Sequence, residues 1–100
     1  MEENIIEKYD VIFRPSSSFK DGAGHFSRCF AFSQNFSKKK LLFILDNEFQ
    51  LFKKKINKKK LEYKIFSKFN YLGIRSKICI LDGYNFSENE RKHWRRNCDY

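Results

Sequence analysis

Four short apolar runs recur along this chain, and the segments between them carry helix signals. The runs are residues 9–14, 40–45, 61–66 and 77–84. Short runs of this kind, bounded by polar or turn residues, are typical of β-strands. The second run, KLLFIL, is continuous and apolar, as in a parallel strand that is covered on both faces. The spacing of the runs therefore predicts a sheet whose strands are connected by helices.

Helices are predicted between and after these runs. Apolar residues within 25–36 recur at helical spacing, and Asp46 can cap a short helix over 47–55. The segment Ser87–Glu90 has the form of a capping box, Ser-x-x-Glu, which opens a last helix. Strands that alternate with helices favour a parallel sheet. The predicted fold class is α/β, with a Rossmann-like parallel sheet.

Length and composition fit one small domain, residues 1–100. The chain has 41% hydrophobic residues, including 12 Phe, enough for a core. Its N-terminus is acidic and lacks a signal-peptide h-region, and no apolar run approaches the ~20 residues that cross a bilayer. The three Cys are odd in number and form no C-x-x-C pair, which fits a reducing compartment. Cys29 is near a helix start, where a thiol can be activated, but a buried structural role is expected for it. We expect a cytoplasmic protein with no membrane partner, no metal and no cofactor.

The formal net charge of +9 has two interpretations. Most of the excess lies in Lys clusters at 38–40, 53–55 and 58–60, where loops and helix ends are expected, and such clusters usually form a solvated surface. A nucleic-acid site is the alternative, with Trp94 stacking on a single strand among the cations of 91–96. An amphipathic helix with Trp94 turned toward the sheet explains the same residues, so nucleic acid is not the expected partner. His93 is expected to be an exposed residue of this helix.

The segment 15–24 interrupts the pattern directly after the first strand. It is longer than the usual βα connection of about 2–6 residues, and Gly22 and Gly24 let a ligand approach the backbone closely. The following helix begins near His25, so its N–H groups can meet an anion. The positive helix end favours a neutral imidazole, which can act as a general base. The other interpretation is a tight glycine turn with His25 at a helix start.

The residues from Arg14 to Cys29 resemble a signature of bacterial nucleotide-sugar hydrolases. That signature reads R-x-D-x-S-x-x-I-G-x-G-H-x-x-R-C, and residues 80–86, ILDGYNF, are similar to the family's hydrophobic-Asp-x-Tyr block. The family contains the UDP-2,4-diacetamido-2,4,6-trideoxy-β-L-altropyranose hydrolases of pseudaminic acid biosynthesis and related spore-coat polysaccharide proteins. The matching positions are Arg14, Ser18, Gly22, Gly24, His25, Arg28 and Cys29.

The resemblance implies the N-terminal half of a fold like that of the B-type glycosyltransferases. The implied reaction hydrolyses a UDP-sugar to UDP and free sugar, with His25 as the catalytic base. Arg14 and Arg28 have two possible roles, contact with an anion or structural pairing with carboxylates, and pairing is favoured for Arg28. The candidate substrate-binding residues are Arg14, Ser18, Gly22, Gly24, Asp82 and Tyr84.

The chain departs from the family pattern at two positions and in length. Ser16 replaces the family's Asp, and Asp21 replaces an apolar residue. The C-terminal nucleotide-binding half is absent from the chain, so we expect little activity unless a separately encoded half is supplied. Two alternatives stay open: a fragment of a B-type glycosyltransferase, whose acceptor is a sugar hydroxyl, and a non-catalytic module that depends on a partner.

Overall fold

The alternation of strands and helices along the chain is confirmed. A computed structural model describes residues 7–16, 24–36, 38–46, 50–59, 61–65, 73–83 and 86–100. Apart from a short 3₁₀ turn, η1 (Gln34–Phe36), strands and helices follow each other as predicted. In chain order they are β1 (Glu7–Pro15), α1 (Gly24–Ser33), β2 (Leu41–Leu45), α2 (Gln50–Lys58), β3 (Glu62–Ile65), β4 (Ile74–Asp82) and α3 (Glu88–Asn97).

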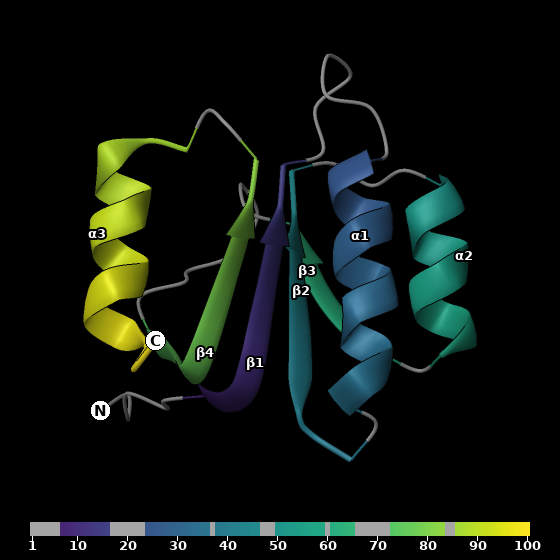
Figure 1. Cartoon of the computed structure of the whole chain (residues 1–100), viewed down its shortest axis with the longest axis horizontal. Helices are drawn as coiled ribbons and strands as arrows, with labels where there is room; N and C mark the ends of the chain where they lie inside the picture. The colour runs from purple at the N-terminus through teal and green to yellow at the C-terminus, as the bar shows by residue number, and fades with distance from the viewer. Residues whose placement is uncertain are drawn as a thin grey trace, which may run out of the picture.

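The strands form one parallel sheet in the order β3-β2-β1-β4. The central strand, β1, pairs with β2 on one side and with β4 on the other. Figure 1 shows α1 and α2 on one face of the sheet and α3 on the opposite face. The Rossmann-like α/β architecture predicted from the sequence is therefore what the chain adopts.

Two strands begin earlier than the apolar runs predicted. The ladder between β1 and β4 starts at the pair Glu7 and Ile74 and continues to Pro15 and Asp82. Polar residues such as Lys8 and Arg75 are included because hydrogen bonds to a neighbouring strand extend a strand beyond its apolar part. The register of this ladder, which ends with Pro15 opposite Asp82, places the carboxyl ends of β1 and β4 side by side.

Stacked Phe rings fill the core between the sheet and helices α1 and α2. Phe26 of α1 and Phe52 of α2 stack with ring centroids 4.0 Å apart, and Phe13 stacks on Phe43 within the sheet at 5.0 Å. All four are buried, and full burial of one such side chain contributes about 1.5–3 kcal/mol. This packing holds α1 against the sheet and so places its first turn.

Helix α3 covers the other face through Trp94, which is only 2% exposed. The inward Trp94 predicted from helical spacing is confirmed. Ser87 caps the helix by accepting a hydrogen bond from the Glu90 N–H at 3.1 Å, while the Glu90 carboxylate accepts from the Trp94 indole at 3.0 Å. His93, expected to be exposed, is half-buried, because its ring stands edge-on to Trp94 with centroids 4.6 Å apart.

The residues after α3 return to the sheet along the outer edge of β4. Cys98 forms a parallel bridge with Ser76, and the Cys79 N–H donates to the Tyr100 carbonyl at 2.9 Å. We call residues 98–100 the tail. Within the described residues, each helix is too short or too polar to cross a bilayer.

Candidate active site

The candidate site lies where β1 and β4 end beside the start of α1. Pro15 pairs with Asp82 in the ladder, and the Ser16 N–H donates to the Asp82 carbonyl at 2.8 Å. Ligands in open parallel sheets collect at the carboxyl ends of the strands. The two sequence blocks that carry the family resemblance meet at this edge.

His25 and Asp82 are in direct contact. His25 Nδ1 lies 2.8 Å from Asp82 Oδ1, and the carboxyl is ionised because hydrogen bonds from Arg28 and then from His25 lower the Asp82 pKa. Arg28 Nη2 also lies 3.0 Å from His25 Nδ1. Because two acceptors facing each other at 2.8 Å would repel, we assign the proton to Nδ1, which donates to Asp82. In the neutral imidazole the lone pair is then on Nε2, the arrangement of a carboxylate-oriented base.

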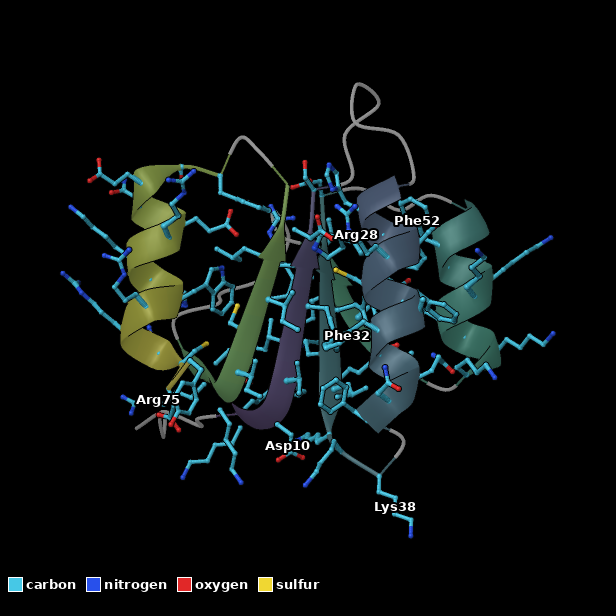
Figure 2. All side chains as sticks on the ribbon, viewed as in Figure 1. Asp10, Arg28, Phe32, Lys38, Phe52 and Arg75 are labelled. Carbon is cyan, nitrogen blue, oxygen red and sulfur yellow. The ribbon has the colours of Figure 1, made fainter. Side chains whose placement is uncertain are left out.

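Arg28 lies three residues after His25 on α1 and completes a cluster of three residues with His25 and Asp82. Its Nε donates to Asp82 Oδ2 at 2.7 Å and its Nη2 donates to Asp82 Oδ1, a bidentate contact that fixes the carboxylate plane. This is the structural pairing favoured for Arg28 from the sequence. The Arg28 side chain is nevertheless 66% exposed, against 17% for Asp82. Figure 2 shows Arg28 near the start of α1, beside the strand ends.

Cys29 lies next to this cluster but is not an activated nucleophile. It is 2% exposed, and its Sγ is 4.0 Å from Asp82 Oδ2. Burial, followed by the negative charge of Asp82, raises the pKa of Cys29 to about 12. The group is therefore a thiol at neutral pH, and the buried structural role expected for Cys29 is confirmed.

Arg14 lies behind the site and pairs with two carboxylates. It is 3% exposed; its Nε donates to Glu90 at 2.8 Å and its Nη2 donates to Asp46 at 2.5 Å. Of the two roles left open from the sequence, the structure places Arg14 in carboxylate pairing. Its contact with substrate stays a prediction.

Asp46 and Glu90 were not recognised as partners of Arg14. The available signal was a charged residue inside an apolar strand, which requires an opposite charge when it is buried. Nothing in the sequence identified which carboxylates supply that charge.

Gly83 is a functional position that sequence reasoning missed. A Cβ at this position would lie 2.3 Å from the Ser16 Cβ, closer than side chains tolerate. Only glycine lets the end of β4 pass this close to the end of β1 and aim Asp82 at His25. The available signal was a Gly directly after the Asp that ends a strand.

The other predicted binding residues have mixed outcomes. Gly24 begins α1, and a Cβ there would meet nothing within 4 Å, so no close packing among the described residues requires glycine. Ser16, which replaces the family's Asp, is buried beside Asp82. The predictions for Ser18, Gly22 and Tyr84 concern residues outside the described ranges.

An apolar cavity of about 310 Å³ opens beside the cluster. Its walls come from β1, β4 and α1, and Arg28 and Asp82 stand at its edge. Phe32, 48% exposed, lies along α1 below Arg28 (Figure 2). The cavity offers an apolar surface next to the charged groups, a combination that suits a small ligand with one polar end.

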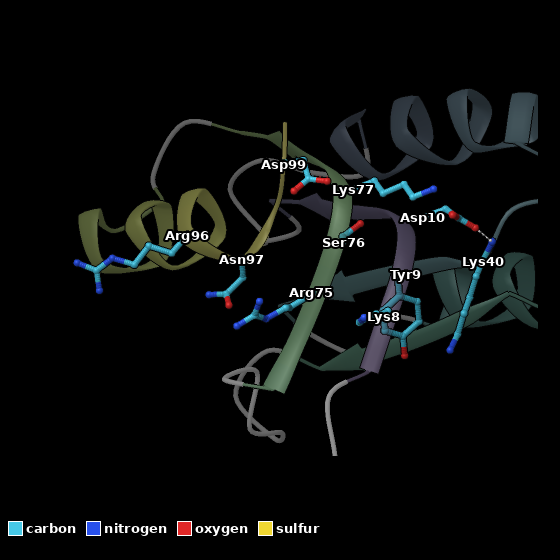
Figure 3. Close-up of a pocket in the computed structure, with 10 residues that line it drawn as sticks. All are labelled: Lys8, Tyr9, Asp10, Lys40, Arg75, Ser76, Lys77, Arg96, Asn97 and Asp99. Atoms are coloured by element: carbon cyan, nitrogen blue, oxygen red, sulfur yellow. Dashed lines mark hydrogen bonds between the residues drawn. The ribbon is translucent and has the colours of Figure 1, made fainter. Parts of the chain in front are cut away.

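A second cavity, of about 420 Å³, lies at the amino ends of the strands. Figure 3 shows its mixed lining, in which Asp10 accepts a hydrogen bond from the Lys40 N–H at 2.7 Å. Asp10 and Asp99 stand among its cations, which are Lys8, Lys40, Arg75, Lys77 and Arg96. This cavity is at the opposite end of the sheet from His25. Among the described residues no group of three His, Cys, Asp or Glu could hold a metal ion.

No family model, curated protein or solved structure matches the chain. The family resemblance noted in the sequence therefore depends on the residue pattern itself. The geometry at His25, Asp82 and Arg28 is an independent observation, because it comes from the packing of the sheet and α1. The resemblance and the geometry concern the same two sequence blocks, residues 14–29 and 80–86.

Proposed function

We propose that this chain is the base-carrying half of a nucleotide-sugar hydrolase, which cleaves a UDP-sugar to UDP and free amino sugar in pseudaminic acid or surface-polysaccharide biosynthesis. The contact between His25 and Asp82 carries the proposal. It joins the Gly-rich loop block to the strand-end block, the two places where the sequence resembles the hydrolase family. The C-terminal half of that family supplies most of the uridine contacts, so tight binding and rapid turnover need a second, uridine-binding part.

The proposed chemistry is general-base hydrolysis at the anomeric carbon. His25 Nε2 takes a proton from water, and the water oxygen forms a bond to the anomeric carbon. The bond from that carbon to the diphosphate oxygen breaks, and UDP leaves with the electron pair. Asp82 acts as a positioning residue, because its ionised carboxylate holds the Nδ1 proton and stabilises the imidazolium that forms.

Arg28 and the neighbouring cavity support a role in substrate binding. The exposed Arg28 guanidinium brings positive charge to the edge of the cavity, where a diphosphate would stand. The apolar walls of the cavity suit the methyl and acetamido groups of a deoxyamino sugar. In this proposal the loop that contains Gly22 lies against the diphosphate, as the resemblance implies.

The test measures UDP release and sugar products with the 100-residue chain at millimolar UDP-sugar over long incubations. We expect slow UDP release with free sugar as the product. His25→Ala should lower the rate about 100-fold or more, since a positioned base contributes about 10²–10⁴. His93→Gln is the matched control, because it alters the chain's other His, and it should leave the rate unchanged.

Each other result has a defined meaning. A new glycoside, formed when a sugar acceptor is added, would assign the site to a glycosyltransferase fragment that uses the same base. Equal UDP release by the chain and His25→Ala would overturn the catalytic role of His25. If neither turnover nor binding of UDP-sugar by saturation-transfer NMR is observed, the hydrolase proposal fails and a non-catalytic module stands.

A further inference from the structure

Two cysteines that are distant in sequence meet at the outer edge of the sheet. Cys79 lies in β4 and Cys98 in the tail, and both contain free thiols. The tail is held against β4 by hydrogen bonds of 2.9 Å from the Cys79 N–H to the Tyr100 carbonyl and from the Tyr100 N–H to the Lys77 carbonyl. Both side chains pack on the apolar cluster that contains Trp94. The backbone pairing thus fixes the two thiols beside each other.

Both thiols can be reached from solvent. They line one open cavity of about 310 Å³, together with Leu81 and Trp94. Cys79 and Cys98 are each half-buried, whereas Cys29 is buried on the other face of the sheet. A small solute that enters this cavity can therefore contact the pair.

The two thiols differ in acidity because of the hydrogen bond between them and their surroundings. A hydrogen bond from the Cys79 thiol lowers the pKa of Cys98, which a Ser76 backbone group lowers further, while burial and Asp99 act in the opposite direction. The same hydrogen bond, followed by burial, raises the pKa of Cys79. Arg91 and Arg95 also line the cavity. The hydrogen bond between the thiols makes Cys98 the more acidic partner, so we assign Cys98 as the nucleophile and Cys79 as the thiol held beside it.

We propose that Cys79 and Cys98 form an oxidation site for small hydroperoxides, which ends in a reversible disulfide between β4 and the tail. The Cys98 thiolate attacks the outer peroxide oxygen and the O–O bond breaks. Hydroxide leaves from hydrogen peroxide, or an alkoxide from an organic hydroperoxide, and takes up a proton to form water or an alcohol. Cys98 is then a sulfenic acid. The Cys79 sulfur attacks the Cys98 sulfur, the S–O bond breaks, and water leaves. The two sulfurs together lose two electrons, and the peroxide gains them.

The disulfide would link the tail covalently to β4. In the reduced form, hydrogen bonds and side-chain packing hold the tail there. The bond closes the segment between residues 79 and 98, which contains all of α3. A cross-link of this kind restricts the unfolded chain, so the oxidised form should unfold at a higher temperature than the reduced form. Reduction by a thiol restores the original state. The site is separate from His25 and does not depend on the proposed hydrolase.

The test treats the reduced 100-residue chain with hydrogen peroxide and maps tryptic peptides without reduction. Cleavage after Arg28, Lys77 and Arg96 puts the three cysteines in different peptides, 29–38, 78–91 and 97–100. We expect peptides 78–91 and 97–100 to be linked, and dithiothreitol to separate them. The Cys29 peptide should stay reduced, which makes it an internal control.

Three single variants test the order of events. Cys79→Ser should leave a sulfenic acid on Cys98 that dimedone traps, and Cys98→Ser should slow oxidation at residue 79 at least tenfold. Cys29→Ser should form the disulfide at the unchanged rate. The proposal is overturned if Cys29 oxidises as fast as Cys98, if Cys98→Ser reacts at the original rate, or if the disulfides found join separate chains.

Discussion

The imidazole of His25 and the carboxylate of Asp82 lie 2.8 Å apart although 57 positions separate them in the sequence. The topology of the sheet explains the contact. Helix α1 follows β1, and β4 pairs with β1, so the residue that ends β4 faces the first turn of α1. The pairing therefore depends on the parallel ladder as much as on the two side chains.

Substitution of Asp82 by Asn should change the tautomer of His25. An amide N–H can donate to Nδ1, which would then lose its proton and leave it on Nε2. Nitrogen-15 NMR of the imidazole should show protonated Nδ1 in the original chain and protonated Nε2 in Asp82→Asn. The corresponding change lowers the rate up to ~10⁴-fold in a serine protease triad. An unchanged NMR spectrum would show that Asp82 does not orient the ring.

Removal of one partner from the buried pair of Arg14 and Glu90 should destabilise the fold strongly. Glu90→Gln leaves Arg14 paired with the carboxylate of Asp46, and breaking a buried pair costs about 3–5 kcal/mol. Urea unfolding measures the loss. Lys92→Ala is the control, since its contact with Glu88 is exposed at 3.7 Å and contributes about 0.3–0.5 kcal/mol. Losses of similar size in both variants would contradict the structural role of Arg14.

The stability of the fold should depend on Asp82 at acid pH. Hydrogen bonds from Arg28 and then from His25 lower its pKa below the ordinary value of 3.8. Because the folded pKa is the lower one, this contribution is complete above the unfolded pKa and is lost as the pH falls through the folded value. Unfolding free energies of Asp82→Asn should fall less steeply below about pH 4.

Arg28→Ala should also make the unfolding free energy fall less steeply in the same acid range, since Arg28 is the largest cause of the lowered Asp82 pKa. The difference should be small, because an exposed ion pair is screened by water and salt. If the unfolding free energies of Asp82→Asn and the original chain run parallel at every pH, the ionised Asp82 is not stabilised by its neighbours on folding.

Gly83→Ala should destabilise the chain by about 1–3 kcal/mol, the usual cost of overpacking. The added Cβ would lie 2.3 Å from the Ser16 Cβ, and both belong to closely held backbone. Combining it with Ser16→Gly removes that contact, so the double variant should be more stable than the sum of the single effects predicts. Gly24→Ala is the matched control and should be nearly neutral, since its Cβ meets nothing within 4 Å. Strictly additive effects at 16 and 83 would argue against the clash.

Much of the fold was predictable because the apolar runs and caps are local signals. Residues 41–45 of the run KLLFIL form β2, which is buried along its whole length, and Ser87 caps α3. Strand starts were predicted less well. Glu7 and Arg75 belong to the strands because their backbones pair with the neighbouring strand, which their polar side chains do not indicate. The prediction that His93 is exposed was wrong for a similar reason, because its ring packs against Trp94.

The site was only partly predictable. The sequence identified His25 and Asp82 as separate candidates from separate blocks, but their contact requires the strand order, which no local pattern contains. The same is true of Arg14, whose partner Glu90 lies 76 positions away. Charge and spacing indicated that partners were needed, and the topology decided which residues they are.

The central place of β1 has a consequence for how the chain acquires its structure. Glu7 must find Ile74, so β4 has to be made before the sheet can close. Contacts between residues this far apart slow folding, because a long loop must be closed before any pairing is gained. Until β4 has been synthesised, one edge of β1 stays unpaired, and the arrival of β4 completes both the sheet and the surroundings of His25.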